Sequence, residues 1–203
     1  MRKLIIIGAR AMGRETYAYA CECGMDVKGF LDSKADALDG FRGYPPILDS
    51  VEHYHPCEED MFVVALGEPA YKFRYVGIIS AKGGEFTTVI HPTSYIGKNV
   101  NIGAGFIICP NAAITNDTEI GNHVIVNVGA SINHDNLIGD GSTICPGARL
   151  AGRVHLGKGV FIGIGALIIP DIKLGDNVVV AAGATVTKSF EKGLLIGIPA
   201  KIR

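Results

Sequence analysis

The chain has 203 residues, a formal net charge of −1 and a mean hydropathy of +0.29. The balanced charge, without a dense Lys/Arg cluster, excludes the electrostatic footprint of a nucleic-acid or anionic-membrane binder and favours a small-molecule partner. The most apolar stretch, 160–169, is about half the length of a membrane-spanning helix. The short apolar run after Met1 lacks the length and cleavage site of a signal peptide, so we expect a cytoplasmic protein without a membrane partner.

The two parts of the chain differ in composition. Eleven of the 15 Phe and Tyr residues precede residue 91, whereas 17 of the 27 Gly residues follow it. Different packing rules in the two parts predict two domains, over residues 1–88 and 89–203. The five cysteines form no CxxC pair and no Cys/His zinc spacing, so we expect neither a disulfide nor a metal site.

The first domain has the pattern of a small Rossmann-like parallel α/β sheet. Apolar runs predict strands over 4–7, 27–31 and 61–66, and helices are expected from the turn at 8–13 through Cys21 and over 71–81. The glycines of the turn read G-x-x-x-x-G and not G-x-G-x-x-G, which argues against NAD. Asp32, at the end of the second strand, is an acidic residue in a position that often contacts a ligand.

The second domain repeats every six residues. In steps of six from Ile96 to Val186 every residue is aliphatic, the position two residues earlier is mostly small or β-branched, and glycine often follows the aliphatic residue. A period of six fits neither a helix nor a plain strand and predicts a solenoid of short strands and corners. We expect the glycines to relieve backbone strain at the corners. A β-sandwich would instead show turn signals at 8–12-residue spacing.

This repeat resembles that of the hexapeptide-repeat acyltransferases. The resemblance implies that three hexads form one coil of a left-handed parallel β-helix and that the chain assembles as a homotrimer. Residues 18 apart would then stack at one corner, with His134 between Asn116 and Gly152. Ile164 and Ala182 would stack on another corner.

The segment from Asn127 to Asp140 resembles a narrower subgroup, the sialic-acid O-acetyltransferases and the bacterial N-acetyltransferases of UDP-4-amino sugars. Both share a histidine followed by an acidic residue within the repeat. The resemblance implies that His134 is the general base, that Asp135 supports its basicity and that Asn127 helps to shape the pocket. Imidazole, with an ordinary pKa near 6.5, suits proton removal from an amine or hydroxyl that attacks a thioester at neutral pH.

The same resemblance implies the binding residues of two substrates. Acetyl-CoA would lie in a groove between two neighbouring β-helices, and a nucleotide-activated sugar would lie in the first domain. The acetyl-CoA contacts would be Thr143, Gly152, Ile164 and Ala182. The sugar-nucleotide contacts would be Gly8, Arg10, Ala11, Met12, Asp32, Ser33 and Gly67. The subgroup commonly has Gly-Ala-Gly/Ser-Gly-His-Gly at the first turn, whereas this chain has Arg10, Ala11 and Met12 before Gly13.

The leading hypothesis is therefore acetyl transfer from acetyl-CoA to an amino or hydroxyl group of an activated sugar, used in surface polysaccharide synthesis. The altered turn leaves the acceptor open, and a sialic-acid O-acetyltransferase is an alternative. A non-catalytic trimeric scaffold that binds a sugar nucleotide is a second. A zinc carbonic anhydrase on the same β-helix is a third, although the histidines lack the spacing of a shared zinc site.

Overall fold

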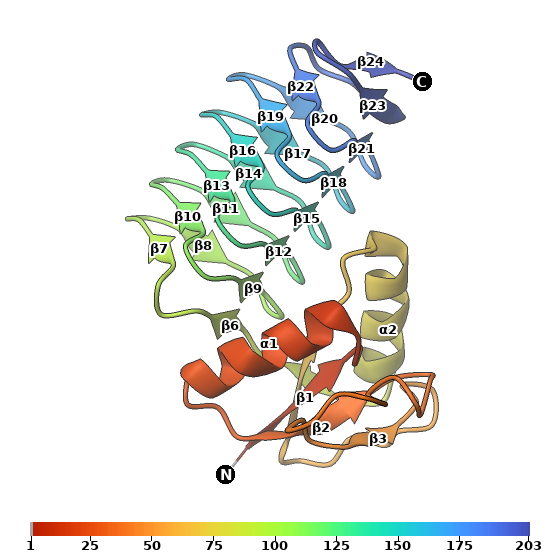
Figure 1. The fold of residues 1–203 in the computed structure, drawn as a ribbon. Coiled ribbons are helices and arrows are strands. Elements are labelled where there is room, and N and C mark those ends of the chain that lie inside the picture. The colour runs from red at the N-terminus through yellow and green to blue at the C-terminus, as the bar shows by residue number, and fades with distance from the viewer. Residues whose placement is uncertain (1) are drawn as a thin grey trace.

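The computed structural model describes residues 2–203 (Figure 1). The first domain is a parallel sheet in the strand order β3-β2-β1-β4-β5. Its elements are β1 Lys3–Ile7, α1 Ala11–Glu22, β2 Val27–Leu31, β3 Ile47–Asp49, β4 Asp60–Val64, α2 Pro69–Ala81 and β5 Glu85–Phe86. The Rossmann-like expectation is confirmed. α2 begins two residues earlier than expected because proline is well suited to the first helical turn.

Both faces of this sheet are covered at β1, which explains why the residues of β1 after Lys3 are continuously apolar. Leu4 and Ile6 of β1 pack in a cluster with Ala20 of α1, whereas Ile5 and Ile7 pack in a cluster with Ile79 of α2. These four of the five β1 side chains are 0–1% exposed. A parallel strand buried on both sides needs an unbroken aliphatic run instead of an alternating one.

The chain leaves this sheet after β5 and enters a parallel β-helix at β6. The strands that follow are β6 Val89–Ile90, β7 Tyr95–Ile96, β8 Asn101–Ile102, β9 Ile107–Ile108, β10 Ala113–Ile114, β11 Glu119–Ile120, β12 Ile125–Val126, β13 Ser131–Ile132, β14 Leu137–Ile138, β15 Thr143–Ile144, β16 Arg149–Leu150, β17 His155–Leu156, β18 Phe161–Ile162, β19 Leu167–Ile168, β20 Lys173–Leu174, β21 Val179–Val180, β22 Thr185–Val186, β23 Leu194–Ile196 and β24 Lys201–Ile202. No helix within residues 2–203 is both long and apolar enough to cross a membrane.

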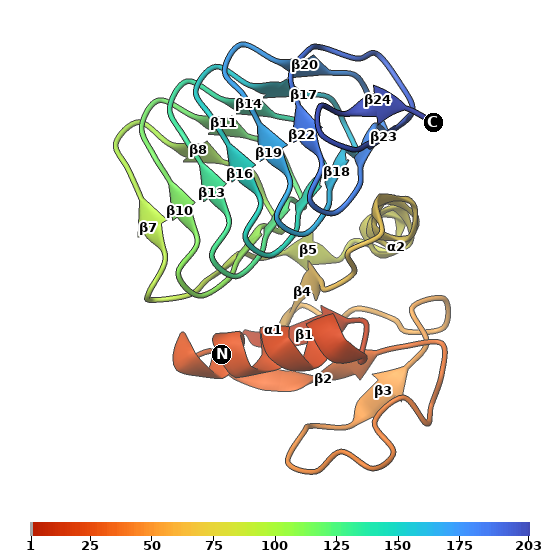
Figure 2. The ribbon, with the colours of Figure 1, turned by 45° about the horizontal axis from the view of Figure 1, so that its top comes forward.

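The strands of the β-helix form three faces, visited in turn by the chain (Figure 2). Face 1 contains β6, β9, β12, β15, β18 and β21, extended by β23 and β24. Face 2 runs from β7 to β22 and face 3 from β8 to β20. Within each face the register advances by 18 residues, as in Ile96, Ile114 and Ile132. The coil of three hexads is therefore confirmed, and its inward aliphatic residues form one buried cluster.

The glycines that directly follow the aliphatic residues have a different cause from the one expected. The left-handed backbone falls on the third residue after each inward aliphatic residue, where φ lies between 55° and 69° throughout residues 99–183. Asn, Asp and Gly, which tolerate this conformation, hold most of these positions. The glycine directly after the aliphatic residue is needed for close stacking, since a Cβ at Gly163 would lie 2.6 Å from the backbone nitrogen of Ala182 in the next coil.

The first domain packs against face 1. Outward side chains of this face, including Ile107 and Ile125, share a buried cluster with Tyr19 of α1 and Phe30 of β2. The imidazole of His91 lies 2.7 Å from the carboxylate of Glu22 at the end of α1. Figure 2 shows the first domain beneath one side of the triangular coil. The corner between faces 2 and 3 therefore lies opposite the face that the first domain covers.

Candidate functional site

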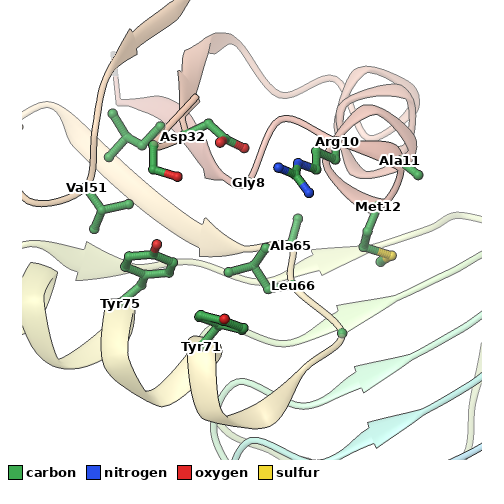
Figure 3. Close-up of a pocket in the computed structure, with 13 residues that line it drawn as sticks. Gly8, Arg10, Ala11, Met12, Asp32, Val51, Ala65, Leu66, Tyr71 and Tyr75 are labelled. Carbon is green, nitrogen blue, oxygen red and sulfur yellow. The ribbon is translucent and has the colours of Figure 1, made fainter. Parts of the chain in front are cut away.

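A cavity of about 300 Å³ opens at the carboxyl ends of β1, β2 and β4 (Figure 3). In open parallel sheets, ligands bind at this edge, where neighbouring strands send their connections to opposite faces. All the residues that were expected to contact a sugar nucleotide line this one cavity. They are Gly8, Arg10, Ala11, Met12, Asp32, Ser33 and Gly67.

The turn after β1 is shaped by close contacts around two glycines. Gly8 has φ +98°, and a Cβ there would lie 2.8 Å from Cδ2 of Leu66. A Cβ on Gly13 would overlap the carbonyl group of Gly8. Asp32 holds the turn from the other side, because its Oδ2 accepts a hydrogen bond from the backbone nitrogen of Ala9 at 2.9 Å. The G-x-x-x-x-G spacing thus has a packing reason that does not depend on a dinucleotide.

One side of the cavity is positively charged. Arg10 immediately precedes α1, and no side chain caps the amino terminus of this helix. Figure 3 shows the Arg10 guanidinium near Gly8, on the cavity side of the turn. A guanidinium beside free backbone N–H groups of a helix start is suited to bind a phosphate.

Two aromatic side chains of the cavity were missed by the sequence interpretation. Tyr71 and Tyr75 lie on α2, four residues apart and therefore on the same side of the helix, and both line the cavity. Figure 3 shows their rings side by side on α2. The sequence signal that could have identified them is a pair of tyrosines four residues apart in the helix after the third predicted strand. Val51 and Leu66, on loops, complete the apolar wall without any such signal.

His134 lies on the corner between faces 2 and 3, two residues after the inward Ile132. Its Nδ1 is 2.6 Å from Oδ2 of Asp135, and the two side chains are 54% and 53% exposed. A carboxylate only accepts hydrogen bonds, so Nδ1 donates its proton to Asp135 and Nε2 carries the free lone pair. Asp135 has φ 60° and occupies the left-handed position of its hexad.

The stacking of His134 agrees with the sequence expectation. A Cβ on Gly152, one coil further on, would lie 2.7 Å from Nε2 and 3.0 Å from Nδ1 of His134. The imidazole therefore occupies the space that a side chain at residue 152 would need. A glycine at this position leaves the ring in place.

His134 differs from other polar side chains at the same hexad position. Asn116, one coil earlier, accepts a hydrogen bond from the backbone nitrogen of Lys98 at 3.0 Å, and Asp140 accepts one from that of Asn122 at 2.8 Å. These side chains tie successive coils together. The His134 ring is instead bonded through Nδ1 to its neighbour Asp135, and within residues 2–203 Nε2 has no hydrogen-bond partner.

The residues expected around the acetyl donor lie on two corners. Gly152 shares the corner of His134, whereas Ile164 and Ala182 follow β18 and β21 on the corner between faces 1 and 2. Asn127 follows β12 on that second corner, is 9% exposed and donates to the carbonyl oxygen of Ile144 at 3.3 Å. Within one chain, Asn127 and His134 therefore do not meet.

Thr143 requires a correction. Its side chain was expected to contact acetyl-CoA, but the residue is 1% exposed and lies where the two domains join. Its hydroxyl donates to the carbonyl oxygen of Gly67 at 2.8 Å and accepts a hydrogen bond from Nζ of Lys72 at 2.9 Å. The hydroxyl is enclosed within the chain because α2 and the loop before it pack over this part of the β-helix.

His123 and His155, two other histidines of the hexads, lie on different parts of the coil. His123 packs edge-on against Phe86 of β5, with ring centroids 4.7 Å apart, and burial lowers its pKa. His155 lies in β17 on face 3. Across residues 2–203, no three His, Cys, Asp or Glu side chains gather as a metal-binding group.

Two family models match the chain. Residues 3–77 match the PglD N-terminal domain, and residues 153–188 match the bacterial transferase hexapeptide (six repeats). A 143-residue segment is 32% identical to GDP-perosamine N-acetyltransferase of Escherichia coli O157:H7. That match covers 66% of this chain and 63% of the relative, so it spans less than two thirds of the relative's length.

Solved structures with similar folds cover the whole chain. The acetyltransferase domain of PglB from Neisseria gonorrhoeae in complex with acetyl coenzyme A is 27% identical, with a TM-score of 0.88 over 100% of this chain and 99% of that one. PerB from Caulobacter crescentus in complex with CoA and GDP-perosamine is 26% identical, with a TM-score of 0.92 over 100% and 98%. The chain is thus similar in its first part to the PglD N-terminal domain and in its second part to the bacterial transferase hexapeptide, and over its whole length its fold is similar to those of these two structures.

Proposed function

We propose that this protein is an acetyl-CoA-dependent N-acetyltransferase that acts on the amino group of a nucleotide-activated sugar. The observation that carries the proposal is the His134–Asp135 pair, which presents a free Nε2 at an exposed corner, against Gly152. The relatives support the substrates: one is named a GDP-perosamine N-acetyltransferase, and two solved neighbours hold acetyl coenzyme A or CoA with GDP-perosamine.

His134 acts as the general base in a direct transfer. The amine nitrogen of the sugar attacks the thioester carbonyl carbon, and Nε2 of His134 takes the proton that the nitrogen loses. The carbon–sulfur bond breaks, and the imidazolium returns the proton to the departing thiolate. Asp135 holds the ring through Nδ1 and stabilises its positive charge during the transfer. No acyl-enzyme is required.

The cavity of the first domain binds the nucleotide part of the acceptor. Arg10 and the free amino terminus of α1 offer donors for its phosphates, and Tyr71 and Tyr75 offer an apolar wall. Asp32 has one oxygen bonded to Ala9 and the other to the backbone nitrogen of Lys34, so it chiefly fixes the turn. GDP-perosamine is the first acceptor to test, because two of the relatives are named for or hold this compound.

The complete site requires a second copy of the chain. Face 1 packs against the chain's own first domain, whereas His134 lies on the opposite corner, so the cavity cannot present a sugar to the His134 of the same chain. Asn127, Ile164 and Ala182 lie on a different corner from His134. In a trimer, the His134 corner of one chain would meet the cavity of the neighbouring chain and that chain's corner between faces 1 and 2. Acetyl-CoA would then contact Gly152 of one chain and Ile164 and Ala182 of the other.

We place the reaction in the cytoplasm, where acetyl-CoA and nucleotide-activated sugars are made, and its product in surface glycan synthesis. The N-acetyltransferase names of the relatives favour transfer to nitrogen over transfer to a sialic-acid hydroxyl. They also favour an enzyme over a non-catalytic scaffold or a zinc carbonic anhydrase.

The proposal is tested by thiol release from acetyl-CoA with GDP-perosamine and, separately, a UDP-4-amino sugar as acceptors. The wild-type protein should release thiol with at least one of them, and His134→Ala should abolish this release. His55→Ala, an exposed histidine in the loop before β4, is the matched control and should retain it. Full turnover by His134→Ala would rule out the base assignment, and no turnover with any amino sugar would rule out the activity.

A further inference from the structure

Lys72 is a lysine with no access to solvent. It lies on α2, its side chain is wholly buried, and burial lowers its pKa to about 7. Its Nζ is 3.0 Å from the carbonyl oxygen of Gly141, 3.3 Å from that of Ser142 and 2.9 Å from Oγ1 of Thr143. Three acceptors match the three N–H donors of an ammonium group.

All three acceptors belong to one short segment of the β-helix. Residues 141–143 follow His134 in the chain and lead from face 3 into β15 on face 1. The ring of Phe73 packs beneath Gly141, where a Cβ would lie 2.8 Å from Cε1 of the ring. The start of α2 is therefore bonded to the segment of the β-helix that follows the corner of His134.

Thr143 extends this attachment to the sugar-nucleotide cavity. Its hydroxyl accepts from Lys72 and donates its only proton to the carbonyl oxygen of Gly67, at 2.8 Å. Gly67 lines the cavity, and the same loop continues through Glu68 into α2. The series Lys72, Thr143, Gly67 thus connects the β-helix with one wall of the cavity through two consecutive hydrogen bonds.

A purely space-filling role does not account for a lysine at this position. Burying an ammonium group costs free energy, and an apolar side chain of similar length would pack into the same space without that cost. The lysine therefore contributes its donors. Those donors act on Gly141, Ser142 and the one hydroxyl that reaches the cavity loop.

We propose that Lys72 and Thr143 are positioning residues that fix the Gly67 wall of the cavity relative to the β-helix. They set the fit of the sugar nucleotide without touching it. This inference rests on the proposed function for its kinetic consequence. Its structural consequence, a cavity loop held in place by the Thr143 hydroxyl, can be measured in the free protein.

The test compares Thr143→Val, which removes only the hydroxyl, with Thr143→Ser, which restores it. Ser142→Ala is the matched control, because the neighbouring Ser142 hydroxyl donates to the carbonyl oxygen of Gly157 inside the β-helix and not to the cavity loop. Hydrogen–deuterium exchange of the segment 65–72 should increase in Thr143→Val and stay at the wild-type level in Thr143→Ser and Ser142→Ala. Lys72→Met, a second variant, should also increase it.

The kinetic arm uses GDP-perosamine and acetyl-CoA. In Thr143→Val the KM for GDP-perosamine should rise about fivefold to tenfold, because a buried hydrogen bond is lost at the cavity wall. The KM for acetyl-CoA should stay within about twofold, and Thr143→Ser should restore both values. A rise in Ser142→Ala of the same size would show general destabilisation and overturn the proposal.

A failure of the positioning role can be distinguished from a failure of the proposed function. Unchanged exchange of residues 65–72 in both Thr143→Val and Lys72→Met overturns the positioning role, whatever the substrate is. Increased exchange in these variants, combined with a wild-type protein that neither binds nor acetylates any nucleotide sugar, supports the positioning of the loop and counts against the proposed function.

Discussion

The imidazole of His134 lies against Gly152, in the space that a side chain at residue 152 would occupy. We predict that Gly152→Ala lowers kcat by about tenfold to a hundredfold, because the added methyl group displaces the ring from its reacting position. Gly77→Ala, where a Cβ meets nothing within 4 Å, is the control. Steady-state thiol release measures both, and an unchanged kcat in Gly152→Ala would show that the ring position is not critical.

The charge of Asp135 can be removed without disturbing its backbone. Asparagine tolerates φ near 60°, the value observed at residue 135, so Asp135→Asn should fold normally. We expect kcat to fall by about tenfold or more, because the amide does not stabilise the imidazolium. Asp117→Asn changes the same hexad position one coil earlier, where the carboxylate accepts from Asn99, and should retain full kcat. Equal kcat values for the two variants would contradict the role of Asp135.

Arg10 should act on the sugar nucleotide alone. Removing a guanidinium from a phosphate contact in Arg10→Ala should raise the KM for the acceptor by about tenfold and leave the KM for acetyl-CoA unchanged. Arg14→Ala is the comparison, because the Arg14 guanidinium stacks on Phe41, with 3.6 Å from Cζ to the ring centroid, and does not line the cavity. Isothermal titration with GDP-perosamine gives the same contrast without turnover. Equal affinity in Arg10→Ala and the wild type would remove Arg10 from the site.

Lys72 should make stability depend on pH above neutrality. Its pKa is about 7 in the folded protein against an ordinary value of 10.5, so the unfolded chain binds more protons between these two values. The free energy of unfolding contributed by Lys72 therefore rises as the pH increases from about 7 to 10.5, by at most about 1.4 kcal/mol per pH unit. Urea unfolding across this range should show the slope in the wild type and a smaller one in Lys72→Met. Parallel curves would mean that Lys72 titrates normally.

The architecture of the second domain was predictable because one rule acts in every coil. Each hexad needs an inward aliphatic residue, and Ile114 and Ile132 stack at the distance that an 18-residue coil imposes. The reason for the glycines that directly follow the aliphatic residues was predicted wrongly. Whether Gly163 serves a strained φ or a close approach depends on the spacing between coils, which a single hexad does not contain.

Only some of the residues that line the cavity could be predicted from the sequence. Gly8 and Asp32 follow strands, and the end of a parallel strand is a position that can be recognised in a sequence. Tyr71 and Tyr75 could have been found from their helical spacing. The burial of Thr143 could not be predicted, because it depends on Lys72 and Gly67, which lie 71 and 76 residues earlier in the chain and are brought onto β15 by the packing of the two domains.

The positions of each hexad have different structural roles, and this difference has an evolutionary consequence. The aliphatic position maintains the core, the residue after it permits stacking, and the third residue adopts the left-handed turn, as Asp135 does. The second residue has none of these three roles. Its side chain can bond to the adjacent coil, as those of Asn116 and Asp140 do, or it can be free of such a bond, as that of His134 is. A lineage can therefore exchange the group at such a corner, gaining or losing a reaction, while the scaffold around it continues to fold.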